Sequence, residues 1–483
     1  MRRELFLGKW RALEGADAPM VDLLLDADHL ATHGVVVGMT GSGKTGLVTV
    51  LVEEALRARI PVLMVDVKGD LPNLLLAFPS FSAEHFLPWV GSVVSPRDPR
   101  PHDEVAQSLA EARRQGLRSW GVDEHELAAF RERTALRVIT PGGSAGERLH
   151  ILSALERHSE RWQHDTESAR AALGAAVSLM LRLLGRDPDP AKSREHVLLS
   201  VLAERRLLRA EPAELGALMR DLAEPPIETI GALAIEDFLP RSERRALAAA
   251  LNTLLASPTF ATWREGVTLD IGAWLTPQDE RTPGVIVSTA HLDDEERALV
   301  LGVLLEELLS WVRTLPGSTG LRALVVFDEV YGFLPPHPAN PPTKRPLVAL
   351  LKQARAFGVG IVVATQNPMD LDYRALSNAG VWAIGRLQTD ADRLRVMEGL
   401  GGGEDGLSRA ELGSIAKRLR QRWFLLRNAH SRGGTVLLQT RWSLSWMRGP
   451  MTRVEIQRAR ELHAGPDGVR AVAEPSLVEA ASG

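Results

Sequence analysis

A glycine-rich stretch near the start of the chain limits the possible folds more strongly than any other segment. It reads GVVVGMTGSGKT from Gly34 to Thr45 and is followed by an apolar helical pattern up to Leu56. Three consecutive valines before the glycines are typical of a parallel strand that is covered on both faces. The succession of strand, Gly-x-x-x-x-Gly-Lys-Thr and helix is that of a phosphate-binding loop, and it predicts nucleotide binding.

Each residue type in this loop has a chemical reason to be there. Glycines let backbone N–H groups approach phosphate oxygens without a Cβ clash, and the helix that follows turns its positive end toward the same anion. The Lys44 ammonium is expected to reach the β- and γ-phosphates, and the Thr45 hydroxyl is an oxygen ligand of the kind Mg²⁺ prefers. A glycine-rich turn without a ligand is the alternative, and the flanking strand and helix argue against it. The predicted nucleotide-binding residues are Gly38, Thr40, Gly41, Ser42, Gly43, Lys44, Thr45 and Gly46.

Composition excludes several classes of protein. The chain has 483 residues, 45% of them hydrophobic, and no cysteine, so a large core is expected and disulfides and thiolate metal sites are excluded. No run of about 18 apolar residues is free of charge, so we expect no transmembrane helix, no membrane partner and a cytoplasmic location. The formal net charge of −4 argues against a surface coated for nonspecific nucleic-acid binding, although a local basic channel is compatible with it.

Apolar runs alternate with helical patterns along most of the chain. This alternation predicts an α/β fold with a mostly parallel sheet and right-handed crossovers. A helical insertion interrupts the alternation, because apolar residues there recur at helical spacing without any strand-like run. One short run, from Leu5 to Trp10, is expected to form an edge strand. The predicted segments are an N-terminal extension (1–33), the first part of the core (34–152), the helical insertion (153–266), the second part of the core (267–446) and a C-terminal helix and tail (447–483).

Two further strand ends carry polar residues suited to phosphate chemistry. Asp328 and Glu329 follow the apolar run LVVF, where the first carboxylate can hold Mg²⁺ and the second can act as general base for a water. Gln366 ends another apolar run, and its amide can donate and accept hydrogen bonds near a γ-phosphate. An acidic pair facing solvent is the alternative for Asp328 and Glu329. Together these residues predict nucleotide hydrolysis coupled to movement.

Hydrolysis of this kind commonly needs an arginine, often from a neighbouring subunit, to neutralise charge in the transition state. Three arginines after the acidic pair are candidates: Arg355, Arg386 and Arg393. Each of them is equally compatible with an ordinary surface or strand-end charge. An arginine supplied in trans requires head-to-tail packing, which closes into a ring.

Several motifs resemble the HerA/FtsK superfamily of ring-forming, RecA-like ATPases that pump DNA, and HerA more than FtsK. The resemblance rests on the phosphate loop, on DVKGD at 66–70 and on VVFDE at 325–329. It rests most specifically on KQARAFGVGIVVATQNP at 352–368 and is supported by GRLQTDADR at 385–393. The segment TRWSLSWMRGP at 440–450 is similar to one near the ends of a HerA-like group of ATP-binding proteins.

The resemblance implies an additional-strand RecA-like fold, a homo-oligomer in the form of a hexameric ring, ATP with Mg²⁺, and DNA in the central pore. It implies phosphate binding by Lys44, Mg²⁺ binding by Thr45 and Asp328, a base role for Glu329 and γ-phosphate sensing by Gln366. HerA also carries an N-terminal β-barrel that helps to dock a nuclease. Only about 33 residues precede the loop here, so a nuclease or other effector is a weaker expectation than the ring.

On this basis we expect an ATPase that works as a DNA translocase or helicase-like motor. One alternative is a conjugation or secretion ATPase that moves protein or nucleoprotein, and another is a nucleotide-gated scaffold that recruits an effector. For DNA contact we predict Lys344 and Arg345, in the proline-rich segment 332–346 directly after the acidic pair. The alternative for this segment is a cap over the nucleotide, with its charges solvated.

Overall fold

The computed structural model describes residues 3–13, 19–93, 100–156, 161–366, 368–376, 379–399, 408–431 and 434–473. Its centre is an 11-stranded sheet in the order β2-β1-β15-β14-β13-β3-β12-β11-β4-β10-β5. The strands are β1 (Glu4–Ala12), β2 (Val21–Asp26), β3 (Gly34–Val37), β4 (Val62–Asp66), β5 (Thr134–Ile139), β10 (Thr282–Ser288), β11 (Ser318–Phe327), β12 (Phe357–Thr365), β13 (Val381–Ile384), β14 (Trp423–Asn428) and β15 (Thr435–Thr440).

Seven neighbouring strands, from β13 to β5, run parallel to one another. The strand before the phosphate loop, β3, is separated from the strand of the acidic pair, β11, by one strand, β12. This is the additional-strand arrangement, so the predicted α/β, RecA-like fold is confirmed. The carboxyl ends of parallel strands meet at one edge of a sheet, where α/β proteins place their ligands. The ends of β3, β4, β11 and β12 therefore gather the predicted site residues at that edge.

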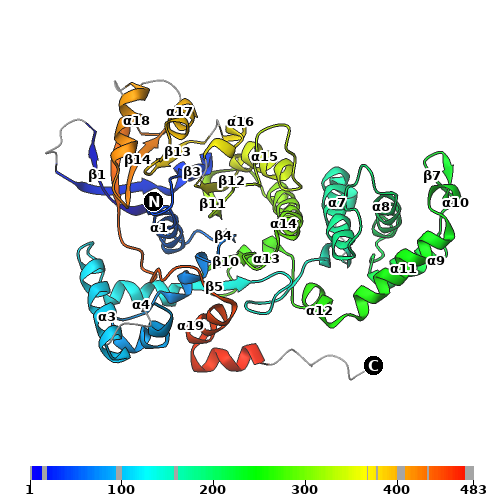
Figure 1. Ribbon diagram of the computed structural model, residues 1–483, viewed down its shortest axis with the longest axis horizontal. Helices are drawn as coiled ribbons and strands as arrows, with labels where there is room; N and C mark the ends of the chain where they lie inside the picture. The colour runs from blue at the N-terminus through cyan, green and yellow to red at the C-terminus, as the bar shows by residue number, and fades with distance from the viewer. Residues whose placement is uncertain are drawn as a thin grey trace.

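Helices cover both faces of the parallel part of the sheet (Figure 1). Val35 and Val37 of β3 pack into one hydrophobic cluster and Val36 into the other, as the alternation of side chains along a strand requires. On the Val36 face lie α1 (Lys44–Arg57), α3 (His102–Arg118) and α4 (Glu124–Arg133). On the opposite face lie α14 (Asp294–Thr314), which starts with a capping box, and α15 (Lys344–Gln353).

The N-terminal residues extend the sheet beyond its parallel part. β1 pairs with β15 on one side and with β2 on the other, all antiparallel. The predicted edge strand at Leu5–Trp10 is therefore second from the edge, because β2 covers it. The prediction was wrong on this point because the alternation in VDLLLD at Val21–Asp26 is too weak to indicate a strand of its own.

The segment between the two parts of the core is mainly helical and projects to one side of the sheet (Figure 1). Its two ends are held together where β6 (Leu149–His150) pairs with β9 (Val267–Thr268). The Ser193 side chain caps one of its helices by accepting from the His196 N–H. The helices are α5 (Ser153–Glu156), α6 (Arg161–His164), α7 (Thr166–Leu183), α8 (Arg194–Leu207), α9 (Leu215–Ala223), α10 (Ile235–Phe238), α11 (Arg241–Ala256) and α12 (Pro258–Arg264).

After β15 the chain crosses back over the Val36 face before the last helix, α19 (Arg453–Ala473). We call residues 440–452 the C-terminal strap. The Arg441 guanidinium is fully buried and pairs with Glu53 and Glu54 of α1 at 3.0 and 2.8 Å. Farther along, the Met451 N–H donates to the Gly69 carbonyl at 2.9 Å. The strap therefore ties α1 to the segment that follows β4. Among the described residues, no helix is both long enough and apolar enough to span a bilayer.

Candidate active site

The phosphate loop is held between the ends of the two strands that flank β3. The Gly38 N–H donates to the Thr365 carbonyl at 3.3 Å, and the Met39 N–H donates to the Arg386 carbonyl at 2.9 Å. Gly43, the residue before α1, has a φ of 93°, and a Cβ there would lie 2.9 Å from the Arg422 backbone nitrogen. Glycine is therefore required at this position both by conformation and by space.

The first turn of α1 supplies the donors for an anion. Lys44, Thr45 and Gly46 open this helix, and the N–H groups of a first turn have no partner within the helix. Gly41 and Gly46 have open space where a Cβ would be, so this side of the loop is accessible. A phosphate group is the ligand that such a loop accepts.

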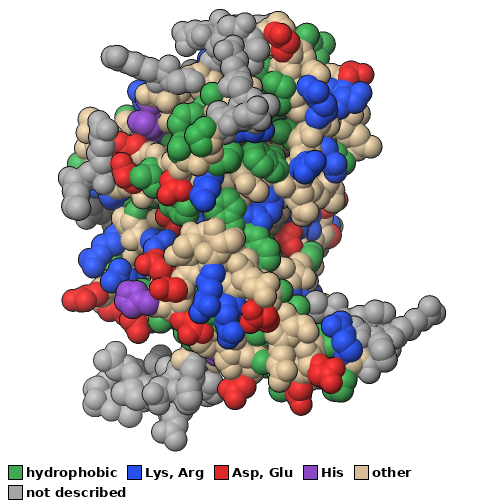
Figure 2. Space-filling view, turned by 90° about the vertical axis from the view of Figure 1, so that its left-hand side faces the viewer, with side chains coloured by type: hydrophobic (Ala, Val, Ile, Leu, Met, Phe, Trp, Pro, Cys, Tyr) green, Lys and Arg blue, Asp and Glu red, His purple; other side chains and the backbone are tan. Residues whose placement is uncertain are grey.

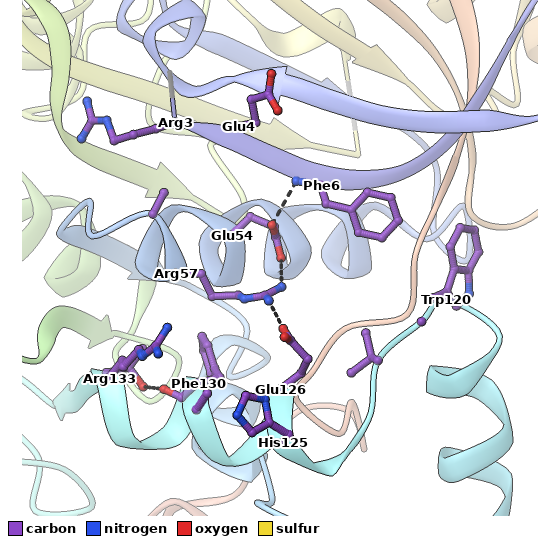
Figure 3. A pocket seen from close by; sticks show the side chains of 15 residues that line it. Arg3, Glu4, Phe6, Glu54, Arg57, Trp120, His125, Glu126, Phe130 and Arg133 are labelled. Carbon is purple, nitrogen blue, oxygen red and sulfur yellow. Dashed lines mark hydrogen bonds and ion pairs between the residues drawn. The ribbon is translucent and has the colours of Figure 1, made fainter. Parts of the chain in front are cut away.

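The far end of α1 is anchored by an ionic chain. Glu54 accepts from the Phe6 N–H at 3.0 Å and from Arg57 at 2.8 Å, and Arg57 also pairs with Glu126 of α4 (Figure 3). The same carboxylate pairs with Arg441 of the strap. The cavity of about 490 Å³ in Figure 3 lies at this far end, away from the phosphate loop, and is no part of the active site.

Asp328 follows β11 at the sheet edge and is 1% exposed. Its N–H donates to the Val65 carbonyl at 3.2 Å, while neither of its carboxylate oxygens has a hydrogen-bond partner in the described part of the chain. Burial raises the pKa of Asp328 to about 7, against the opposing charge of Lys44. A buried carboxylate without a partner beside a phosphate loop fits Mg²⁺, for which Asp328 and Thr45 are suitable ligands.

Glu329 lies next to the loop lysine. The Lys44 Nζ is 3.4 Å from Glu329 Oε2, and the Gln366 N–H donates to Oε1 at 3.3 Å. Burial raises the pKa of Glu329, but the charges of Lys44 and Lys68 outweigh burial and leave it below its usual value. Burial also lowers the pKa of Lys44 despite the two carboxylates beside it. Glu329 is therefore an ionised carboxylate at the position where a general base is needed.

Gln366 joins the loop to the acidic pair. The Thr40 hydroxyl donates to the Gln366 side-chain carbonyl at 2.7 Å, and the backbone of Gln366 holds Glu329. The structure thus brings together Thr40, Lys44, Asp328, Glu329 and Gln366.

Lys68 also belongs to this site, although it was not among the predicted site residues. Its Nζ lies 2.7 Å from Glu329 Oε2, closer than that of Lys44. It stands in the turn after β4, which the Asp66 carboxylate fixes by accepting from the N–H groups of Gly69 and Asp70 at 2.9 and 3.1 Å. The position of the DVKGD motif at the carboxyl end of a parallel strand is the signal that points to Lys68.

The three candidate arginines lie in different places. The backbone of Arg386 contacts the loop of its own chain, and its side chain is exposed. Arg393 is 7% exposed and donates to the carbonyls of Leu387 and Gln388 at 3.1 Å. Arg355 is exposed and precedes β12, so it lies at the opposite edge of the sheet from the loop, about 30 Å away by strand length.

The residues predicted to contact DNA are not in a loop. Lys344 and Arg345 form the first turn of α15, so the predicted loop 332–346 ends earlier, at Thr343. Lys344 is 13% exposed and is held by Asp372 at 3.6 Å and by the Ala339 carbonyl at 3.1 Å. Arg345 is 64% exposed and makes a surface pair with Glu167 at 3.7 Å. Only Arg345 of this pair is available on the surface.

Comparison with known proteins agrees with this geometry. Residues 7–135 match the family model described as the central domain of helicase HerA, which confirms the predicted resemblance over this part of the chain. No curated protein matches the sequence.

Similar solved structures include VirB4 of Thermoanaerobacter pseudethanolicus, with 13% identity, a TM-score of 0.50 and coverage of 90% of this chain and 96% of that one. They also include the plasmid coupling protein TrwB with ADP and Mg²⁺, with 14% identity, a TM-score of 0.47 and coverage of 94% and 98%. The VirB4 match supports the P-loop ATPase fold.

Proposed function

We propose that this chain is an ATP-hydrolysing motor subunit of the HerA type, and that it binds ATP with Mg²⁺. The observation that carries the proposal is the meeting of Lys44, Asp328, Glu329 and Gln366 beside the phosphate loop. These residues come from the segments that follow three parallel strands, β3, β11 and β12. The match of residues 7–135 to the HerA central domain supports the same assignment.

Each residue has a part in hydrolysis. Lys44 and the N–H groups of the loop would bind the β- and γ-phosphates, while Thr45 and Asp328 would hold Mg²⁺, which would neutralise phosphate charge. The ionised Glu329 accepts a proton from the attacking water. Gln366 bridges Thr40 and Glu329, so it is placed to report whether a γ-phosphate is present.

We further propose that the subunits form a ring in which Arg355 completes the neighbour's site. Arg355 is exposed at the sheet edge opposite its own loop, so it can reach phosphate only in another subunit. A contact between opposite edges of identical subunits is heterologous and closes into a ring when the rotation permits. A hexamer is the assembly that the HerA resemblance implies.

The other two arginines are less suited to act in trans. Arg393 already has its guanidinium occupied by two backbone carbonyls and by Asp390 of the same helix. Arg386 adjoins its own loop, where it is placed to act within one subunit. Of the three candidates, Arg355 therefore suits the trans role best.

We extend the proposal to DNA as the polymer that the motor moves. The net charge is −4, and on the face shown in Figure 2 the basic and acidic side chains are interspersed, so a DNA site has to be local. The exposed Arg345 is one of the proposed DNA contacts. A second basic group, Lys417, Arg418 and Arg420, is exposed shortly before Arg422, whose N–H donates to the Ser42 carbonyl of the phosphate loop at 2.8 Å. Contacts of this kind bind the DNA backbone without reading sequence.

The experiment is an ATPase assay of the full chain with and without Mg²⁺ and with and without double- and single-stranded DNA. We expect hydrolysis that a chelator abolishes and that DNA stimulates. The absence of nucleotide hydrolysis under all conditions would contradict the motor. Hydrolysis that DNA leaves unchanged would contradict only the DNA part, and would favour a motor acting on protein or a nucleotide-gated scaffold.

A further inference from the structure

Two lysines from different strands converge on one carboxylate oxygen at this site. Glu329 Oε2 lies 2.7 Å from the Lys68 Nζ and 3.4 Å from the Lys44 Nζ. The phosphate loop accounts for Lys44, since that residue is the loop's own cation. Lys68 lies outside the loop motif, so phosphate binding by the loop does not explain why Lys68 lies beside Glu329.

The backbone beneath Lys68 is firmly held. The Asp66 carboxylate accepts from the N–H groups of Gly69 and Asp70, and its second oxygen accepts from the Ser288 hydroxyl at 2.7 Å. Gly69 has a φ of 87°, and its carbonyl accepts from the strap residue Met451. The turn that carries Lys68 is thereby fixed from β4, from β10 and from the C-terminal strap.

The side chain of Lys68 is less confined than its backbone. It is 31% exposed, whereas that of Lys44 is 4% exposed and that of Glu329 is 9% exposed. A lysine head on a four-carbon stem can change partners while its Cα stays in place. A lysine whose backbone is fixed and whose ammonium group can move is suited to a change of partner within one site.

Charge decides which partner Lys68 takes. Without phosphate, the ionised Glu329 is the nearest anion to both lysines. The γ-phosphate of ATP brings further negative charge to the end of the loop, and charge-assisted hydrogen bonds to phosphate are among the strong ones. A Lys68 that turns to this phosphate leaves the Glu329 carboxylate free for water, whereas ADP offers no γ-phosphate to attract it.

We propose that Lys68 is a positioning residue for the base: it pairs with Glu329 when no γ-phosphate is bound and moves to the γ-phosphate when ATP is bound. This inference rests on the proposed function, because it takes Glu329 as the base and ATP as the ligand. It explains how the carboxylate is restrained without ATP and released with it.

The experiment compares nucleotide affinities by calorimetric titration of the full-length protein with ADP and with a non-hydrolysable ATP analogue. For Lys68→Met we expect about tenfold weaker binding of the analogue, an ADP affinity within about twofold of the wild type, and at least about tenfold slower hydrolysis. Lys68→Arg keeps a cation and is expected to restore most of the analogue affinity. Lys192→Met, an exposed lysine of the insertion, is the matched control and should change neither affinity.

The possible outcomes distinguish a failure of this inference from a failure of the proposed function on which it rests. Equal losses for ADP and for the analogue, or no loss for either, would show that Lys68 only stabilises the fold or the loop, and would overturn the inference. Thermal unfolding of each variant shows whether an equal loss of affinity for ADP and for the analogue comes from misfolding. If Lys68→Met is misfolded, the affinities of the Lys68→Arg protein test the inference instead. A wild-type protein that neither binds nor hydrolyses ATP would overturn the proposed function itself.

Discussion

The Thr40 hydroxyl donates to the side-chain carbonyl of Gln366 at 2.7 Å, across 326 positions of sequence. This bond joins the tip of the phosphate loop to the end of the strand inserted between β3 and β11. The backbone N–H of Gln366 contacts Glu329 in turn. Gln366 therefore links the loop to the base through its side chain and its backbone, in addition to the direct contact between Lys44 and Glu329.

The first prediction concerns this bridge. Gln366→Ala is expected to leave ADP affinity near the wild-type value and to lower kcat by about 10- to 100-fold, because the amide acts only when a γ-phosphate is present. Steady-state kinetics with a separate ADP titration measures this. Thr40→Ser keeps the hydroxyl and serves as control, with activity close to the wild type. A Gln366→Ala protein with unchanged kcat would remove Gln366 from the mechanism.

The second prediction separates binding from chemistry. Glu329→Gln keeps the shape of the side chain but removes the base, so ATP should still bind while hydrolysis falls by about 100-fold or more. Lys44→Ala removes the cation of the loop and is expected to weaken ATP binding itself. Equilibrium binding and single-turnover hydrolysis, measured on the same preparations, give both quantities. Hydrolysis at the wild-type rate in Glu329→Gln would refute the assignment of the acidic pair.

The third prediction tests the ring. Arg355→Ala should bind ATP and still assemble, yet fail to hydrolyse, since the residue acts in the neighbouring site. Added to wild-type subunits, it should depress activity more steeply than simple dilution does.

Arg322→Ala is the matched control for the ring, because Arg322 is another exposed arginine near the start of a parallel strand at that edge. Mixing curves and light scattering under assay conditions provide the measurement. Full activity in a strictly monomeric protein would contradict assembly through Arg355.

The fourth prediction concerns stability in acid. His33 is 3% exposed, and its Nδ1 accepts from the Ile361 N–H at 3.1 Å. Burial, with a smaller contribution from the nearby charge of Arg355, lowers the pKa of His33 from 6.5 to about 4. The unfolded chain therefore binds this proton more readily, so the contribution of His33 to stability is complete above pH 6.5 and is lost as the pH falls toward 4.

Between pH 7 and pH 4.5 this group should cost the wild type ~2.5 kcal/mol of unfolding free energy. His33→Asn removes the titration, and asparagine tolerates the φ of 69° at this position. Urea unfolding across this pH range should give a flatter pH dependence for the variant. Parallel curves for the two proteins would show that His33 is not the group responsible.

Much of the site was predictable because its residues stand at the ends of apolar runs. Parallel strands place such ends at one edge, so the phosphate loop, Asp328 and Gln366 come together for a topological reason. Lys68 was not predictable in the same way, because its partner Glu329 is 261 positions away and no spacing connects them. The closeness of the two side chains follows from β4 lying next to β11.

The start of α15 was mispredicted for a reason of local chemistry. Pro341, Pro342 and Pro346 indicated a loop up to residue 346. Pro346, however, is the third residue of the helix, where the missing N–H would have no partner in any case. Lys344 thus became part of a helix end held by Asp372 rather than of an open loop.

The C-terminal strap has a consequence for the order in which the molecule can be made. Glu53 is fully buried, and it accepts from Arg441 and from the N–H groups of Leu444 and Ser445. A nascent chain that ends before residue 441 already contains the phosphate loop and every parallel strand of the sheet. In such a chain Glu54 can still pair with Arg57, but Glu53 lacks Arg441, and a carboxylate that is buried without its cation costs several kcal/mol. The helix that follows the phosphate loop therefore reaches its final packing only after residues 441–445 have left the ribosome.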